Sequence, residues 1–437
     1  MLTTPASLAI TPIGHPLHAT VRVPGSKSLT NRALLVASLA RGTTQLQNAL
    51  FSDDSCYLAV ALQTLGFDIR LDEASHEMTV TGLGGNIPVD KAKLFVGNAG
   101  TAARFLTAFL TLGHGEYLLD GDSRMRERPI QDLIDALNQL GVELEATNNC
   151  PPVEIFARGL LGGKTKIAGN ISSQFLSALL MVAPYAKSPI EIEVTTELNS
   201  RPYVEMTLAI MKDFGVDVQR NNYQSFKIPI STYQLPHATP SLESPVSTYG
   251  IESDASAASY FFAAPAICGG KVRVENISRT SKQGDIAFLG ILGQMGCIIK
   301  EGMDFIEVAG TNTLIGIDVD MRDIPDTAQT LATIAPFASS PTRIRGIASA
   351  RVKETDRVHA TCTELQRLGI RVEEHEDGMT IYPCDEIQPG MIQTYNDHRM
   401  AMAFSLIGLR VDGIRIENPA CVSKTFPNYF EVLDALR

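Results

Sequence analysis

Four cations of this chain, Lys27, Arg32, Arg104 and Arg399, stand at or near the start of a run of small and apolar residues. A positive charge is unfavourable in the first turn of a helix, because the helix dipole already places partial positive charge there. A bound anion would reverse that penalty and would use the same unpaired backbone N–H groups. Four such cases in equivalent positions predict a shared site for an anionic ligand.

These cations lie in three of six polar segments that each precede an apolar run, namely GSKSLTNR, GNAGTAAR, GNISSQF, ESDASAAS, IPDTAQT and YNDHRMA. Ser, Thr, Asp and Asn are common helix caps because their side-chain oxygens accept hydrogen bonds from the exposed N–H groups. Capping alone can account for Asp254, Asp326, Ser172 and Ser173. It does not account for the cations.

Further basic residues stand at the starts of other predicted helices. Arg128 precedes a proline-initiated helix, Lys424 precedes the segment TFPNYF, and Lys353, Glu354 and Arg357 alternate within RVKETDR. Each can also be a solvated surface charge, and KETDR can form ion pairs at spacings of three and four residues along a helix. Both interpretations stay open at this point.

Two common nucleotide-binding motifs do not fit the sequence. A Walker loop ending at Lys27 requires glycine at the positions of Val21 and Ser26. A dinucleotide fingerprint beginning at Gly82 requires glycine at the position of Ile87. The segment VPGSKSLTNR is therefore predicted to hold an anion in some other way.

The elements that position these residues recur along the chain. A helical stretch ends at a glycine and a strand-like run follows, with the glycines at 66, 141, 215, 296 and 369, which are 75, 74, 81 and 73 residues apart. This pattern predicts a left-handed glycine cap after each helix. The small-residue helices alternate with these helices, are apolar nearly all round and are expected inside, whereas the glycine-capped helices have polar faces and are expected outside.

Six such units, the last of which stops at the C-terminus, form too long a chain for one core and are expected to group in threes. The Pro-, Ser- and Thr-rich stretch 225–250 separates the third unit from the fourth and marks a domain crossing at its end. A second crossing near Pro24 and Gly25 follows if the first residues supply a strand to the C-terminal half. The expected domains are 1–24 with 251–437, and 25–250.

Composition excludes several classes of protein. A net charge of −11 disfavours nucleic-acid binding, because no basic surplus is available to displace counterions. Seven widely spaced cysteines without a CxxC pair favour idle thiols over disulfides or a zinc site. No signal peptide or membrane span is indicated, and no cluster of His residues has ligand spacing. We expect a cytoplasmic monomer without metal or organic cofactor.

The motifs together resemble the 5-enolpyruvylshikimate-3-phosphate synthase family, and they run from PGSKSLTNRAL through NAGTAAR, RERPI, SSQF, SRPY, SDASAASY, IPDTAQT, RVKETDR and YNDHRMAM to SKTFPNYF. The likeness covers essentially the full chain. It implies an α/β fold, a two-domain inside-out α/β barrel of six βαβαββ units, three per domain, with the active site in the cleft between the domains. It also implies transfer of the enolpyruvyl group of phosphoenolpyruvate to the 5-hydroxyl of shikimate 3-phosphate, with release of phosphate.

The resemblance also implies which residues bind each substrate. Those for shikimate 3-phosphate are Lys27, Ser28, Arg32, Ser172, Ser173, Gln174, Ser200, Tyr203, Asp326 and Lys353. Those for phosphoenolpyruvate are Lys27, Gly100, Arg128, Gln174, Arg357, Arg399 and Lys424. The catalytic residues are Asp326, Glu354 and Lys27, with Asp326 expected to accept the hydroxyl proton and either Glu354 or Lys27 to protonate C3.

Two departures from the family pattern bear on the site. Ser349 replaces an Asn that many relatives carry four residues before the lysine of KETDR, so one ligand contact is expected to be lost or shortened. Phe105 replaces a frequent Pro, which is expected to tilt its helix and alter sensitivity to glyphosate at the phosphoenolpyruvate site without abolishing it, since Gly100 is kept. His398 is expected to be structural.

Two alternative functions stay open. The related UDP-N-acetylglucosamine enolpyruvyl transferase shares the architecture but lacks the KSxxNR pattern and usually relies on a loop cysteine, and no cysteine lies in RERPI. A non-catalytic anion-binding relative would keep the fold without turnover.

Overall fold

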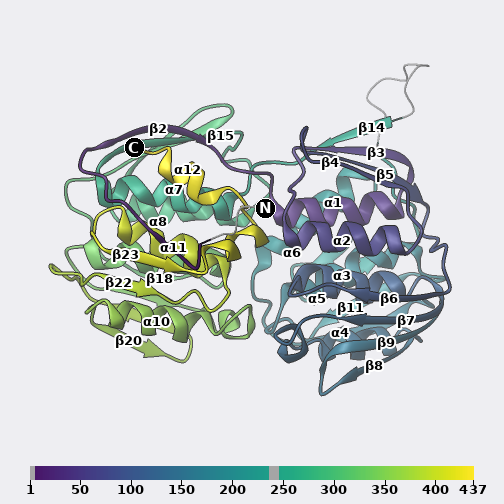
Figure 1. Cartoon of the computed structure of the whole chain (residues 1–437). Helices are drawn as coiled ribbons and strands as arrows, with labels where there is room; N and C mark the ends of the chain where they lie inside the picture. Colours follow the sequence, from purple (N-terminus) through teal and green to yellow (C-terminus); the bar gives the residue numbers. More distant parts are fainter. Residues whose placement is uncertain (1–4, 236–245) are drawn as a thin grey trace. The chain divides into compact units, whose positions relative to one another are not determined.

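The computed structural model describes residues 5–235 and 246–437. The chain forms two compact units (Figure 1). The C-terminal unit consists of Met1–Pro24 and Glu252–Arg437, and the N-terminal unit consists of Gly25–Ile251. Each unit has its own hydrophobic core.

The N-terminal unit contains three four-stranded sheets. Their strand orders are β14 (Val246–Gly250), β3 (Arg41–Gln47), β5 (Glu77–Leu83) and β4 (Ile69–Asp72); β6 (Lys91–Phe95), β7 (His114–Asp120), β9 (Cys150–Arg158) and β8 (Glu143–Thr147); and β10 (Gly163–Ile167), β11 (Ile190–Val194), β13 (Ser225–Ile228) and β12 (Gln219–Asn221). In each sheet the first pair is parallel and the other pairs are antiparallel. The three sheets are therefore copies of one topology.

The C-terminal unit repeats this topology in two four-stranded sheets, and its third sheet has three strands. Its strand orders are β2 (Leu17–Arg22), β15 (Gly270–Glu275), β17 (Phe305–Ala309) and β16 (Ile298–Glu301); β18 (Asp318–Asp320), β19 (Thr342–Arg345), β21 (Gly378–Ile381) and β20 (Val372–His375); and β1 (Ser7–Ala9), β23 (Ile414–Glu417) and β22 (Gly390–Ile392). Strand β2 runs parallel to β15 and lies beside it in Figure 1. The start of the chain therefore supplies a strand to a sheet of the C-terminal unit.

Two sets of helices alternate along the chain. The small-residue helices are α1 (Lys27–Leu39), α3 (Gly100–Leu110), α5 (Ser173–Val182), α7 (Ala255–Cys268), α9 (Ala328–Ile334) and α11 (His398–Gly408). The glycine-capped helices and the last, truncated copy are α2 (Asp53–Thr64), α4 (Gln131–Asn138), α6 (Arg201–Asp213), α8 (Phe288–Gln294), α10 (Arg357–Arg367) and α12 (Tyr429–Asp434). Every residue of α3, α7, α9 and α11 is buried, whereas the second set is buried on one face only. Both expectations from periodicity are confirmed.

The five glycines that end the outer helices all have left-handed backbones. Their φ values are +92°, +82°, +82°, +106° and +79° at positions 66, 141, 215, 296 and 369. This conformation is costly for a residue with a Cβ atom, so glycine is required at these points. The predicted caps are confirmed.

All seven cysteines are free thiols. Within residues 5–235 and 246–437, none of the helices combines the length and the hydropathy needed to cross a bilayer.

We expect Gly296→Ala to destabilise the C-terminal unit by about 1 to 2 kcal/mol. The cost comes from the backbone, because the new Cβ would approach no atom closer than 3.4 Å while φ is +106°. Gly290→Ala is the matched control: it lies within α8, meets no atom within 4 Å and should raise stability by about 0.5 to 1 kcal/mol. Thermal unfolding followed by circular dichroism measures both. Equal thermal unfolding midpoints for the two variants would contradict the requirement for glycine at position 296.

Candidate active site

In the C-terminal unit, three carboxylates surround one buried arginine. Arg357 begins α10 and its side chain is only 3% exposed. Its Nε lies 2.7 Å from Asp397 Oδ2, its Nη2 lies 2.7 Å from Glu354 Oε2, and its Nη1 lies 3.1 Å from Asp326 Oδ1. The i,i+3 ion pair that the sequence left open therefore exists, but as one part of a buried network. Burial alone would lower the pKa of Arg357, and the three carboxylates instead raise it above its ordinary value.

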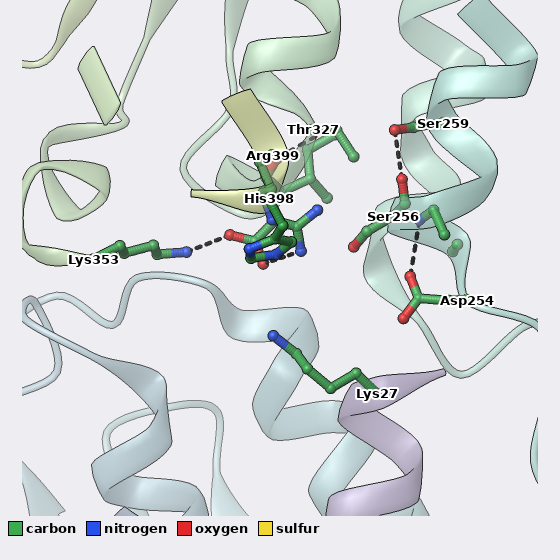
Figure 2. A network of polar contacts seen from close by, with 12 residues as sticks. Lys27, Asp254, Ser256, Ser259, Thr327, Lys353, His398 and Arg399 are labelled. Atoms are coloured by element: carbon green, nitrogen blue, oxygen red, sulfur yellow. Dashed lines mark hydrogen bonds and ion pairs between the residues drawn. The ribbon is translucent and has the colours of Figure 1, made fainter. Parts of the chain in front are cut away.

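Asp326 accepts hydrogen bonds from three cations. It lies in a 3₁₀ turn, Pro325–Thr327, before α9. Lys353 Nζ is 2.5 Å from its Oδ1 (Figure 2), Arg399 Nη2 is 2.8 Å from its Oδ2, and Arg357 approaches from α10. Burial lowers the pKa of Lys353, and the charge of Asp326 opposes this shift. Asp254, by contrast, caps α7 by accepting from Ala257 N at 2.9 Å (Figure 2).

Glu354 and Lys424 extend the cluster. Glu354 Oε1 lies 3.9 Å from Lys424 Nζ, and both side chains are largely buried. Lys424 ends the 3₁₀ segment η7 (Pro419–Lys424), so the cation comes from the last repeat. A dense set of alternating charges therefore gathers within the C-terminal unit.

In the N-terminal unit, Lys27 has a buried acidic partner. Ser26 caps α1 by accepting from Leu29 N, which places Lys27 at the first helical position. Lys27 Nζ is 3.4 Å from Oδ2 of Asp54, which is 2% exposed at the start of α2. Asp54 could not be recognised as this partner from the sequence, because acidic residues at a helix start are ordinarily explained by the helix dipole.

Arg32 is buried and donates to oxygen atoms of the protein. Its Nε lies 2.7 Å from Thr207 Oγ1, its Nη1 lies 3.1 Å from the carbonyl oxygen of Ser28, and its Nη2 lies 3.1 Å from the carbonyl oxygen of Tyr203. Burial lowers its pKa to about 10. The centre of the Phe105 ring lies 5.2 Å from the Arg32 guanidinium. Phe105, which replaces a frequent proline, therefore packs from α3 against α1.

Arg128 and Gly100 lie against each other. Arg128 Nη1 donates to Asn98 Oδ1 at 2.9 Å and to its carbonyl at 3.1 Å, while its buried Nε has no partner in the described residues. A Cβ on Gly100 would lie 2.4 Å from Arg128 Nη2. Glycine at the start of α3 therefore lets the guanidinium cross over the helix terminus.

Two further helix starts carry predicted ligands. Ser172 caps α5 by accepting from Gln174 N at 3.3 Å, with Ser173 as the first helical residue, and Gln174 Nε2 lies 3.2 Å from Thr101 Oγ1 on α3. Ser200 has a left-handed backbone, with φ of +55°, before α6. Tyr203 on α6 is joined to α1 through Arg32, so helices α1, α3, α5 and α6 are cross-linked by these residues.

Arg104 is buried and contacts the RERPI segment. Its guanidinium donates to Pro129 O at 2.7 Å and to the sulfur of Met125 at 3.3 Å, and the residue is 3% exposed. The cation therefore fastens the RERPI segment to α3. His398 is fully buried, with Nδ1 3.5 Å from Asp397 Oδ1, and the Oγ of Ser349 is buried without a partner among the described residues.

The chemistry of these groups defines a class of enzyme. Arginine forks and lysines suit phosphate and carboxylate groups, and carboxylates beside them can transfer protons. Within the described ranges, no cluster of three or more His, Cys, Asp or Glu side chains has a geometry for a metal ion. Fold and side chains are those of an α/β enzyme that acts on small, multiply charged anions.

Comparison with known proteins identifies the family. Residues 12–433 match the family model described as EPSP synthase (3-phosphoshikimate 1-carboxyvinyltransferase). A protein of Trichormus variabilis named 3-phosphoshikimate 1-carboxyvinyltransferase is 50% identical over 427 residues, 97% of each chain. One of the same name from a Marinomonas species is 50% identical over 419 residues, 95% of this chain and 96% of its own. The chain belongs to the EPSP synthase family, which confirms the resemblance of its motifs.

Solved structures agree on the fold. EPSP synthase from Acinetobacter baumannii has a TM-score of 0.80 at 25% identity, covering 98% of this chain and 97% of that one. The enolpyruvyl transferase NikO from Streptomyces tendae has a TM-score of 0.78 at 18% identity with the same coverage. The six-repeat α/β architecture is that of the enolpyruvyl transferases.

We expect Asp397→Ala to destabilise the C-terminal unit by about 3 to 5 kcal/mol, because it leaves the buried Arg357 without its partner at Nε. Asp318→Ala is the control, since it removes a carboxylate from an exposed pair with Arg345 and should cost at most about 1 kcal/mol. Urea denaturation measures both changes. Comparable losses for the two variants would show that the Arg357 network is not a special constraint.

Proposed function

We propose that this protein transfers the enolpyruvyl group of phosphoenolpyruvate to the 5-hydroxyl of shikimate 3-phosphate and releases phosphate. Its membership of the EPSP synthase family over nearly the whole chain carries this conclusion. The side-chain chemistry is consistent with it, because both substrates are multiply charged anions and the chain places arginines and lysines at successive helix starts.

The proposed ligands divide between the two units. For shikimate 3-phosphate, the N-terminal unit supplies Lys27, Ser28, Arg32, Ser172, Ser173, Gln174, Ser200 and Tyr203, and the C-terminal unit supplies Asp326 and Lys353. For phosphoenolpyruvate, the N-terminal unit supplies Lys27, Gly100, Arg128 and Gln174, and the C-terminal unit supplies Arg357, Arg399 and Lys424. We propose that both sets act on the same pair of substrates.

Arg32 has a modified role in this proposal. Since its donors bind the carbonyl oxygens of Ser28 and Tyr203, it holds the backbone that presents these two side chains. Its positive charge adds to the local field that attracts an anion.

Both steps of the reaction require proton transfer. In the addition step, the 5-hydroxyl attacks C2 of phosphoenolpyruvate and loses its proton to Asp326, while C3 gains a proton from Glu354 or Lys27. In the elimination step, phosphate leaves C2 of the tetrahedral intermediate and the C3 methyl group returns one proton to the residue that supplied it, which forms the double bond of the enol ether. Asp326 lies beside Lys353 and Arg399, and Glu354 lies beside Lys424, so a cation adjoins each carboxylate that would handle a proton.

We further propose that the protein works as a cytoplasmic monomer that binds neither nucleic acid nor a cofactor. The acidic net charge of −11 supports the expectation that it does not bind nucleic acid.

Phosphate release separates this function from its alternatives. With phosphoenolpyruvate and shikimate 3-phosphate the protein should release phosphate, and with phosphoenolpyruvate and UDP-N-acetylglucosamine it should not. A coupled colorimetric assay for inorganic phosphate measures both. Release with the nucleotide sugar alone would identify the related transferase, and release with neither would leave only a binding protein.

Asp326→Ala should keep substrate binding within about tenfold and lower kcat by about 100-fold or more, since the proton acceptor is lost. Asp434→Ala, which removes an exposed carboxylate that pairs with Arg437 in the same unit, should leave kcat unchanged. Steady-state kinetics and calorimetric titration with shikimate 3-phosphate measure rate and binding. An unchanged kcat for Asp326→Ala would remove this residue from the proton transfer.

A further inference from the structure

The turn before α11 has an unfavourable backbone. Asp397 N donates to Thr394 O at 2.8 Å, which closes a four-residue turn. Its two central residues, Tyr395 and Asn396, have φ values of +54° and +55°, the signs found in a type I′ turn. A bulky residue such as tyrosine rarely adopts this conformation, and strain of this kind persists only where the surroundings hold it.

A buried carboxylate on α10 holds the entry to this turn. Glu364 is completely buried. Its Oε1 accepts from Tyr395 OH at 2.9 Å, and its Oε2 accepts from Gln393 N at 3.0 Å. Arg367 Nη1 lies 2.9 Å from Oε1 and supplies the counter-charge from the helix surface. Such a charge is tolerated in a core only when it is paired and hydrogen-bonded, so these contacts fix the position of Tyr395.

The other side of the turn is tied to the last repeat. Asn396 Oδ1 accepts from Asn418 Nδ2 at 3.1 Å, and Asn418, with φ of +44°, begins η7. That segment ends at Lys424. The turn thus contacts α10 through Glu364 and η7 through Asn418.

The turn places Asp397 against Arg357 and Arg399, two proposed ligands of phosphoenolpyruvate. The Asp397 carboxylate is fully buried and binds Arg357 at Nε and Nη2, at 2.7 and 3.2 Å. Its Oδ1 also caps α11 by accepting from Arg399 N at 2.9 Å. A shift of the turn would therefore displace Arg357 and Arg399 together.

We propose that Glu364 and Tyr395 are positioning residues that orient Arg357 and Arg399 toward phosphoenolpyruvate through Asp397. This inference rests on the proposed function. Neither Glu364 nor Tyr395 belongs to the proposed ligands of either substrate. They therefore affect substrate binding only through the orientation of the two arginine side chains. Burial raises the pKa of Tyr395 to about 12, which keeps its hydroxyl a donor throughout the pH range of an assay.

Tyr395→Phe tests the inference because it removes one hydroxyl and keeps the ring. We expect KM for phosphoenolpyruvate to rise about fivefold to tenfold, which is part of the loss associated with one charge-assisted hydrogen bond, because the arginines are held by further contacts. KM for shikimate 3-phosphate should change less than about twofold, because most of its proposed ligands lie in the N-terminal unit. Tyr382→Phe is the matched control: it removes a tyrosine hydroxyl that donates to Glu373 at 2.8 Å in the same unit, and both constants should stay unchanged.

Glu364→Gln is the second variant, and it should raise the same KM selectively. Should it fail to fold, Tyr395→Phe decides alone. Unchanged constants, or equal rises for both substrates with a lowered unfolding midpoint, would overturn the inference and leave Glu364 a purely structural residue. Wild-type protein that releases no phosphate from the two substrates would instead overturn the proposed function and this inference with it.

Discussion

The burial of Arg357 among Asp397, Glu354 and Asp326 is the constraint on which the C-terminal half of the site depends. A guanidinium at 3% exposure is stable only where every donor edge meets an acceptor. The carboxylate acceptors come from three separate points, the turn before α11, the segment before α10 and the 3₁₀ turn before α9. Because all three carboxylates bind Arg357, the starts of three helices are held together. Lys353 and Arg399 also bind one of these carboxylates, that of Asp326.

The repeat architecture explains how these helix starts come to be chemically useful. Each of the six repeats contributes one largely buried helix, and in five of the six the segment at the start of that helix includes a proposed ligand or a carboxylate of the network. The N-terminal unit follows the same principle with other partners, since Lys27 pairs with Asp54 while Arg32 binds backbone carbonyls. The repeated helices and sheets thus position the side chains, and the proposed ligand specificity depends on a few residues at the helix starts.

Much of the fold could be predicted because it depends on local periodicity. The glycine caps and the alternation of buried and half-buried helices both follow from spacing and composition. The partners of charged residues could not be predicted, because they depend on contacts distant in sequence. Arg104 and Arg399 look alike at a helix start, yet the first fastens Pro129 and Met125 while the second contacts Asp326. Asp54 and Glu364 were missed for the same reason.

The most direct measurement of the central constraint is solvent exchange of the Arg357 Nε–H by proton–nitrogen NMR, with the signal assigned through an Arg357→Lys sample. Because that group is buried and donates to Asp397 at 2.7 Å, the account predicts a sharp signal without substrate that exchanges far more slowly than the Nε–H groups of exposed arginines such as Arg70. Exchange as fast as that of the exposed arginines would contradict the account.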